Sequence, residues 1–241
     1  MRSEMSEEQE IYTDLWLPSH AGGDTGRPYV FINMVCTVDG SIAFEGKVYG
    51  IGNSADRRVM RTLRSKADAV MIGGGTLRAE KLSLGLDAED PRRTPLAVVL
   101  TNAGDVPLQS NLVRDERQHV LVLLAEGADK GAERRFRDIA EVRRVSAYAS
   151  GAIDLAKALE TLKSDYNVER LLVEGGPTLN DAMISSNLAD ELFLTIAPTL
   201  LSANTPNTPP ITGGALREPR DLRLLSAYLD TDELFLRYAL L

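Results

Sequence analysis

The sequence has very few residues that could build a disulfide or a soft-metal site. It contains one cysteine, Cys36, and two histidines, His20 and His119, in 241 residues. A single cysteine excludes a disulfide within the chain and a cysteine-built zinc site, and two histidines leave little for a histidine-built one. We therefore expect no bound metal. The neighbours of Cys36 are apolar, which favours a buried small side chain over a nucleophile.

The sequence also lacks a long apolar run and an excess of positive charge. No stretch reaches the roughly 18 to 20 apolar residues that cross a bilayer, and the first residues are acidic, unlike those of a signal peptide. The formal net charge is −8, which argues against a nucleic-acid-binding protein because such proteins usually present a basic face. These features predict a cytoplasmic protein that binds neither membrane nor nucleic acid.

The composition is that of one folded domain. Hydrophobic residues make up 44% of the chain, which is enough for one sizeable core, although aromatic residues make up only 5%. Residues 1–27 are rich in acidic residues and predict a partly mobile leader, whose apolar patch 11–17 docks on the rest. We expect residues 28–241 to form a single domain. The segment 202–214 is rich in Ser, Thr and Pro and predicts a loop or lid.

Strand and helix patterns alternate along the chain. Short apolar runs of strand character occur at 29–36, 69–73, 96–100, 120–124, 142–145, 170–173 and 192–196. Helical spacing occurs at 54–64, 132–139, 154–162 and 179–187, with Ser54 and Asp154 as expected N-caps. A hairpin of residues 222–228 and 233–240 ends the chain. This order predicts an α/β fold: a mainly parallel mixed sheet with helices on both faces and a C-terminal antiparallel hairpin.

Two strands that run directly into glycines indicate an anion-binding site. The strand 170–173 ends at Glu174, and Gly175-Gly176 then leads into an expected helix that begins near Pro177-Thr178. Glycines have no Cβ, so a phosphate can approach the backbone, and the free N–H groups of the helix start attract an anion. The buried strand 67–72 likewise runs into Gly73-Gly74-Gly75-Thr76. Because parallel strands end at the same edge of a sheet, we expect the two turns to lie side by side.

Neither turn is a familiar nucleotide-binding motif. Both lack the G-x-G-x-x-G pattern of the usual dinucleotide site and the Gly-Lys-Ser/Thr of a P-loop. Taken alone, each is equally compatible with an ordinary tight turn, so a different architecture is needed.

Four blocks, at 33–43, 67–76, 173–179 and 189–198, together resemble a known family, the pyrimidine reductases of riboflavin biosynthesis, over residues 28–240. The resemblance implies a dihydrofolate reductase-like fold, NADPH as cofactor and a homodimer. It also implies reduction of the ribosyl group of 5-amino-6-(5-phosphoribosylamino)uracil to ribityl. The chain has no H-x-E or P-C-x-x-C zinc deaminase signature, so we expect a reductase domain alone.

The resemblance also implies roles for individual residues. Cofactor contacts fall on Thr37, Gly73, Gly74, Gly75, Thr76, Glu80, Thr101, Gly175, Gly176, Pro177, Thr178 and Leu179. Substrate contacts fall on Asn33, Arg64, Leu84 and Glu174, with Arg64 gripping the phosphate through two hydrogen bonds. Asp39 and Glu80 are the catalytic candidates, for substrate orientation or proton delivery. A simple turn at Asp39 and a helix-end cation at Arg64 are the structural alternatives.

Cofactor preference follows from the same positions. Thr101 and Asn102 end a strand where the resemblance places the 2′-phosphate of NADPH, and we expect no acidic residue there to repel it. NADPH is therefore expected to bind more tightly than NADH.

The chain departs from the family pattern after Thr76. The usual V-L-x-D-D-P is replaced by Leu-Arg-Ala-Glu-Lys-Leu, so Glu80 stands for the first aspartate. A family arginine that helps to hold the phosphate falls near Asp87, for which Lys81, Arg92 or Arg93 could substitute. Two alternatives therefore stay open: a paralogous NADPH-dependent reductase of a pterin, dihydrofolate or other heterocycle, and a non-catalytic NADP-binding protein. Turnover distinguishes the non-catalytic NADP-binding protein from either reductase, because the non-catalytic protein would bind NADPH without transferring a hydride.

Overall fold

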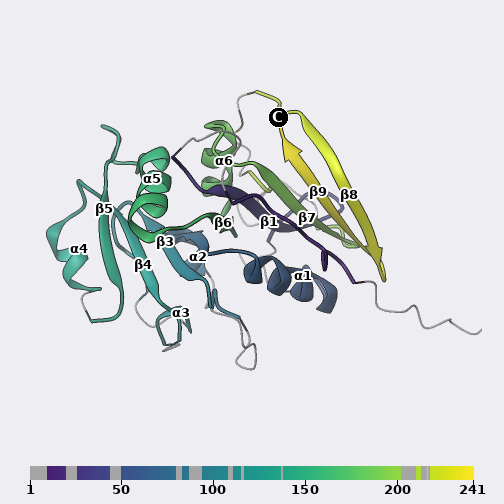
Figure 1. The fold of residues 1–241 in the computed structure, drawn as a ribbon, viewed down its shortest axis with the longest axis horizontal. Coiled ribbons are helices and arrows are strands. Elements are labelled where there is room, and N and C mark those ends of the chain that lie inside the picture. Colours follow the sequence, from purple (N-terminus) through teal and green to yellow (C-terminus); the bar gives the residue numbers. More distant parts are fainter. Residues whose placement is uncertain are drawn as a thin grey trace, which may run out of the picture.

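The computed structural model describes residues 10–19, 26–43, 50–79, 83–86, 94–107, 111–114, 117–136, 138–201, 210–212, 216 and 218–241. Within these residues one sheet has the strand order β5-β4-β3-β2-β6-β1-β7-β9-β8 (Figure 1). The strands are β1 (Tyr29–Thr37), β2 (Ala69–Gly73), β3 (Leu96–Thr101), β4 (Val120–Ala125), β5 (Glu141–Val145), β6 (Arg170–Val173), β7 (Glu191–Ala197), β8 (Leu222–Asp230) and β9 (Glu233–Leu240).

The sheet is parallel from β5 to β7 and ends in an antiparallel hairpin. All neighbouring pairs among β1 to β7 run in the same direction, whereas β9 is antiparallel to both β7 and β8. The strands expected from the apolar pattern all form, and the expected mixed sheet with its C-terminal hairpin is confirmed. The crossovers place the carboxyl ends of the parallel strands at one edge, where ligand sites form in open α/β sheets.

Helices cover both faces of the sheet, as Figure 1 shows with α6 above and α1 below the central strands. The helices are α1 (Ser54–Ser65), α2 (Gly74–Ala79), α3 (Asn111–Arg114), α4 (Lys130–Arg134), α5 (Leu155–Tyr166) and α6 (Pro177–Ser185). Side chains alternate along β1, so that Val30 and Ile32 join the core under α5 and α6, while Phe31 joins the core under α1. The central strands of the sheet are therefore buried on both faces.

Several helix boundaries differ from the sequence-based expectation. Asn53, not Ser54, is the N-cap of α1, because its side chain accepts the Ala55 N–H at 2.5 Å. The expected helix 132–139 is wrong in position: α4 begins two residues earlier, because Asp129 accepts the Gly131 N–H, and it ends at Arg134. Asp154 is confirmed as the N-cap of α5. The short helices α2 and α3 lack an apolar repeat and were not expected.

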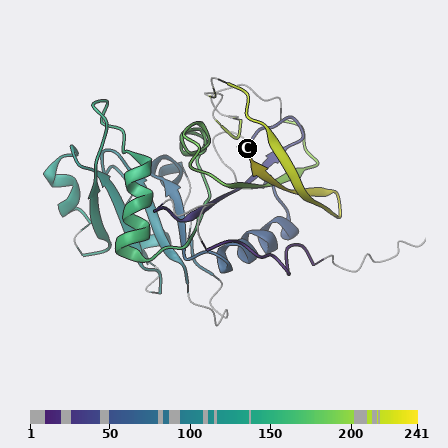
Figure 2. The ribbon, with the colours of Figure 1, turned by 45° about the horizontal axis from the view of Figure 1, so that its top comes forward.

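The N-terminal segment packs on the α1 side of the sheet (Figure 2). The Tyr12 ring meets the rings of Phe193 and Tyr228 edge-on, each at 5.1 Å between centroids. Ile11, Tyr12, Leu15 and Leu17 are buried, which confirms that this patch docks on the body. Trp16 is 74% exposed, and its carbonyl accepts a hydrogen bond from Arg237 Nη2 at 3.4 Å.

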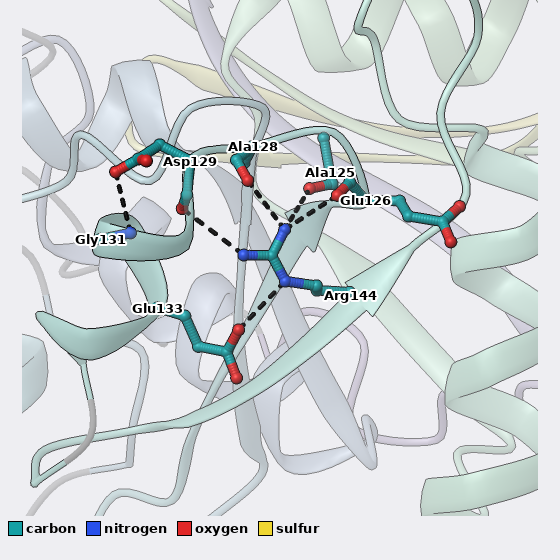
Figure 3. A network of polar contacts seen from close by, with 7 residues as sticks. All are labelled: Ala125, Glu126, Ala128, Asp129, Gly131, Glu133 and Arg144. Carbon is teal, nitrogen blue, oxygen red and sulfur yellow. Dashed lines mark hydrogen bonds and ion pairs between the residues drawn. The ribbon is translucent and has the colours of Figure 1, made fainter.

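Arg144 on β5 binds the loop between β4 and α4 (Figure 3). Strand β5 lies three places along the sheet from β2, which leads into one of the glycine turns. Its Nη1 donates to the carbonyls of Glu126 and Ala128 at 2.8 and 2.9 Å, and its Nε donates to the Glu133 carboxylate at 3.0 Å. One guanidinium thus satisfies carbonyls that the turn leaves without partners, which is a structural role.

Candidate active site

The two glycine turns lie side by side. Strands β2 and β6 are neighbours, with Met71 opposite Val173, so Gly73 and Glu174 leave the sheet together. The Gly73 N–H donates to the Gly175 carbonyl at 2.8 Å. Gly175 has a φ of 85°, which favours glycine, and the Gly175–Gly176 peptide bond is cis. The expected juxtaposition of the turns is confirmed.

A cavity of about 440 Å³ opens between these turns, the loop after β3 and the start of α5. It gathers residues from four separate segments of the chain. The expected cofactor residues that line it are Gly73, Gly74, Gly75, Thr76, Thr101, Gly176, Pro177, Thr178 and Leu179. Gly175 and Thr37 do not line it, and Glu80 lies outside the described residues.

The cavity wall fits the phosphates of a dinucleotide. Gly176 is the N-cap of α6 and offers no side-chain hydrogen bond to the helix start, and the cavity reaches Thr178 and Leu179 in its first turn. The positive end of α6 therefore faces the cavity. A Cβ built on Gly73 would make ordinary van der Waals contacts at 3.9 Å, whereas one on Gly176 would lie 2.6 Å from the Thr76 Oγ1.

The far end of the cavity is shaped by the loop after β3. Thr101 Oγ1 accepts the Gly104 N–H at 3.1 Å, and Asn102 Oδ1 accepts the Ile153 N–H at 3.2 Å. Asp105 also lines the cavity, where it pairs with Arg78 of α2 at 3.0 Å. The expectation that no acid stands near Thr101 is therefore wrong, because the turn at Gly104 brings Asp105 back beside the strand end.

On the α1 side of the same sheet edge, two expected substrate residues contact each other. Arg64 donates from Nε and Nη2 to the two carboxylate oxygens of Glu174, both at 2.7 Å, and from Nη1 to the Gly85 carbonyl at 3.0 Å. Both side chains are nearly buried, at 7% and 11% exposed. Arg64 thus holds a carboxylate in a fixed orientation.

The other two expected substrate residues differ in their surroundings. Asn33 follows Ile32, the register partner of Val173, so it lies beside Glu174 on the same face. Its Oδ1 is buried without a hydrogen bond from the described residues, so an acceptor remains for a ligand donor. The Leu84 side chain is fully buried in the core under α1, and a contact with a substrate stays a prediction for its backbone.

Asp39 organises a turn at the end of β1. Thr37 Oγ1 donates to Asp39 Oδ1 at 2.5 Å and accepts the Ser41 N–H at 3.0 Å. The Leu201 N–H donates to both oxygens of Asp39, at 3.2 and 3.3 Å. The turn that the Asp-Gly pair indicates is present, and a catalytic role for Asp39 stays a prediction.

Asp56, in the first turn of α1, is a candidate that the sequence did not reveal. Its carboxyl is half-buried and accepts a hydrogen bond from Thr195 on β7, and it lies close enough to Glu174 to feel its charge. Burial, and then the charge of Glu174, raise the pKa of Asp56. An acid in a first helical turn ordinarily serves the helix dipole, so its position in the sequence gave no signal of a site.

Two other kinds of feature are absent from the described residues. None of their helices is long and apolar enough to cross a membrane. Nor do they contain a group of three or more His, Cys, Asp or Glu side chains arranged to hold a metal ion.

Comparison with known proteins agrees with this architecture. The sequence model of the RibD C-terminal domain matches residues 28–236. The chain belongs to the RibD C-terminal domain family. The expected family is therefore confirmed, and so is the fold, since the solved RibD structures superpose on the same mixed sheet.

Individual members of the RibD C-terminal domain family align over most of the chain. A protein of Archaeoglobus fulgidus, named 2,5-diamino-6-ribosylamino-4(3H)-pyrimidinone 5′-phosphate reductase, is 33% identical over 185 residues, which cover 73% of this chain and 82% of the relative. A protein of the same name from Methanothermobacter thermautotrophicus is 29% identical and covers 88% and 98%. Acinetobacter baumannii RibD has a TM-score of 0.74 at 25% identity, and this chain spans 59% of its length.

Proposed function

We propose that this chain is an NADPH-dependent reductase of riboflavin biosynthesis that converts the ribosyl group of a phosphoribosylaminopyrimidine to ribityl. The observation that carries the proposal is the cavity between two adjacent glycine turns, faced by the uncapped start of α6, in a member of the RibD C-terminal domain family. Relatives named as reductases of this pathway support it.

The cofactor half of the proposal rests on the cavity. When bound, a nicotinamide dinucleotide would supply the hydride. The first turn of α6 would bind its pyrophosphate, and Thr76 and the glycines 73–75 would shape the wall beside it. The chain's own task is then to orient the substrate at the neighbouring edge of the sheet and to exclude water.

The substrate half rests on polar groups on the α1 side of that edge. Glu174 and Asn33 would contact the pyrimidine, which offers both donors and acceptors, and Arg64 would keep the Glu174 carboxylate in place. Asp56 is the described acid best suited to hold or move a proton there, because burial raises its pKa. We include Glu80 and Asp39 as further candidates for proton delivery.

The pyrimidine itself has two candidate forms. The sequence resemblance implies 5-amino-6-(5-phosphoribosylamino)uracil, whereas the two archaeal relatives are named for a diaminopyrimidinone, which carries an amino group in place of one ring carbonyl. A functional test therefore has to supply both compounds.

One observation favours a related enzyme as the second candidate. Arg64, expected to grip the substrate phosphate, is instead bonded to Glu174 and Gly85. A reductase of dihydrofolate or a pterin needs no phosphate grip, so these substrates belong in the same assay.

Complementation tests the proposal in the cell. Expression of the chain in a riboflavin auxotroph that lacks its pyrimidine reductase should restore growth without riboflavin, and the Gly176→Val variant, expressed to the same level, should not. Failure of the wild-type chain to complement, while a known reductase does so, would contradict the proposal. We propose that the enzyme works in the cytoplasm.

We also propose a homodimer, with its interface at the hairpin. Leu192 and Phe193 of β7 are buried within the subunit, so they do not supply this interface. The exposed apolar side chains gather instead on the edge strand β8 and beside it, at Leu222, Leu224, Leu225, Leu229 and Leu234. Light scattering should give twice the 26.3 kDa of one chain, and Leu224→Glu with Leu229→Glu should give a monomer; a monomeric wild type would refute the dimer.

A further inference from the structure

The glycine-turn cavity has two charged side chains among the described residues that line it. These are Arg78 and Asp105, which form an ion pair with each other. Arg78 lies on α2, three residues after Gly75, and its Nη2 is 3.7 Å from where a Cβ on Gly75 would be. Asp105 comes from the loop that follows Thr101.

We propose that Arg78 is the residue that recognises the 2′-phosphate of NADPH, and that Asp105 is its partner in the unliganded protein and competes with the phosphate for it. This inference rests on the proposed function, because it presupposes that the cavity binds a nicotinamide dinucleotide. A preference for NADPH requires a cationic group near the 2′-phosphate. Neither the glycine turns nor Thr101 supply one, whereas Arg78 does.

The exposure of the pair makes such an exchange of partners favourable. The Arg78 and Asp105 side chains are 47% and 60% exposed, and ion pairs so open to water contribute little to stability. A phosphate dianion offers more charge and more acceptor oxygens than a carboxylate, and an arginine can bind it through two hydrogen bonds. Arg78 therefore loses little when it leaves Asp105 for the phosphate.

Neighbouring arginines are less suited to this role. Arg135 donates to the Gly104 carbonyl at 3.1 Å and does not line the cavity. Arg134 is exposed on α4 and also lies outside the lining, so it serves as a matched control for the loss of one positive charge.

Ligands that differ only in the 2′-phosphate provide the test. Calorimetry would compare adenosine 2′,5′-bisphosphate with adenosine 5′-monophosphate, and NADPH with NADH, on the wild type and on the Arg78→Ala, Arg78→Lys, Asp105→Asn and Arg134→Ala variants. In Arg78→Ala, affinity for the 2′-phosphorylated ligands should fall by about 30-fold, which is near 2 kcal/mol, and affinity for the others should hardly change.

The other variants sharpen the result. Arg78→Lys should lose less because it keeps the charge, and Arg134→Ala should behave as wild type. Asp105→Asn should bind the 2′-phosphorylated ligands several-fold more tightly, because it removes a competing and repelling charge. Since both side chains are exposed, these variants should unfold at the wild-type temperature, and if Arg78→Ala does not fold, Arg78→Lys and Asp105→Asn decide.

Three outcomes overturn the inference. They are a wild-type preference for the 2′-phosphate that survives in Arg78→Ala, an equal loss of both ligand types in that variant, and a wild type without any preference. In each of these cases the proposed function still stands if the wild type binds NADPH and the Gly176→Val variant does not. A wild type that binds neither NADPH nor NADH contradicts the proposed function itself.

Discussion

Arg64 and Glu174 form a bidentate ion pair that joins the end of α1 to the turn after β6. Both hydrogen bonds measure 2.7 Å, between residues 110 positions apart in the sequence. The side chains are almost fully enclosed, so the two charges depend on each other for stabilisation. This pair fixes the carboxylate that faces the proposed substrate.

Removal of one partner should destabilise the protein strongly. Arg64→Ala leaves the Glu174 carboxylate buried without its partner, and we expect a loss of about 3 to 5 kcal/mol in the free energy of unfolding. The double variant Arg64→Met with Glu174→Gln should recover most of this loss, because no unpaired charge remains. Urea unfolding measures both. Equal stabilities of Arg64→Ala and the wild type would show that the pair is not buried in solution.

Kinetics of Arg64→Lys distinguish a grip on Glu174 from a grip on the phosphate. Lysine keeps the charge but loses the two-pronged geometry, so kcat/KM should fall by roughly ten- to a hundredfold. If Arg64 acts through Glu174, the fall should be the same with the phosphorylated substrate and with its dephosphorylated form. A fall confined to the phosphorylated substrate would instead assign Arg64 to the phosphate, as the sequence resemblance implies. NADPH affinity serves as the control and should not change.

Gly176 should be intolerant of any side chain. A Cβ there would meet the Thr76 Oγ1 at 2.6 Å, at the point where the two turns form the cavity wall. We expect Gly176→Ala to weaken NADPH binding by about ten- to a hundredfold and Gly176→Val to abolish it in a folded protein. Gly127→Ala is the matched control, because a Cβ at Gly127 has nothing within 4 Å. Wild-type NADPH affinity in folded Gly176→Val would make this turn purely structural.

The raised pKa of Asp56 should appear as a pH-dependent stability difference. Burial raises the pKa of Asp56 above its ordinary value, so the folded state binds the Asp56 proton more tightly than the unfolded state. This group therefore contributes stability at a pH below its unfolded pKa, and the contribution is lost as pH rises through the folded pKa. Relative to Asp56→Asn, the wild type should lose stability between acid and neutral pH. A difference that is constant with pH, measured by urea unfolding, would contradict the raised pKa.

The sequence predicted the parts of this fold that depend on local patterns. Buried parallel strands such as 120–124 read as short apolar runs, and Asp154 caps a helix whose apolar spacing is plain. Both glycine turns could be predicted because glycine has no Cβ, so a run of glycines after a strand indicates a place where a ligand can approach the backbone. The position of α4 was missed because its cap, Asp129, precedes a stretch with no apolar repeat.

The polar half of the site depends on contacts that no local pattern contains. The partner of Arg64 lies 110 residues away, and Asp105 returns to the cavity only because the chain turns at Gly104. Asp56 reads as an ordinary helix-start acid until Thr195 and Glu174 are seen beside it. These side-chain contacts across the sheet edge could be identified only in the structure.

The central claim is tested most directly by the reaction itself. The purified protein would be mixed with NADPH and either 5-amino-6-(5-phosphoribosylamino)uracil or the corresponding diaminopyrimidinone, with dihydrofolate and a pterin in parallel, and the products would be identified by mass spectrometry. We predict stoichiometric oxidation of NADPH with formation of a ribityl product, heavier than the phosphoribosyl substrate by two hydrogen atoms. Tight NADPH binding without oxidation by either pyrimidine, or oxidation by dihydrofolate or a pterin alone, would contradict the account.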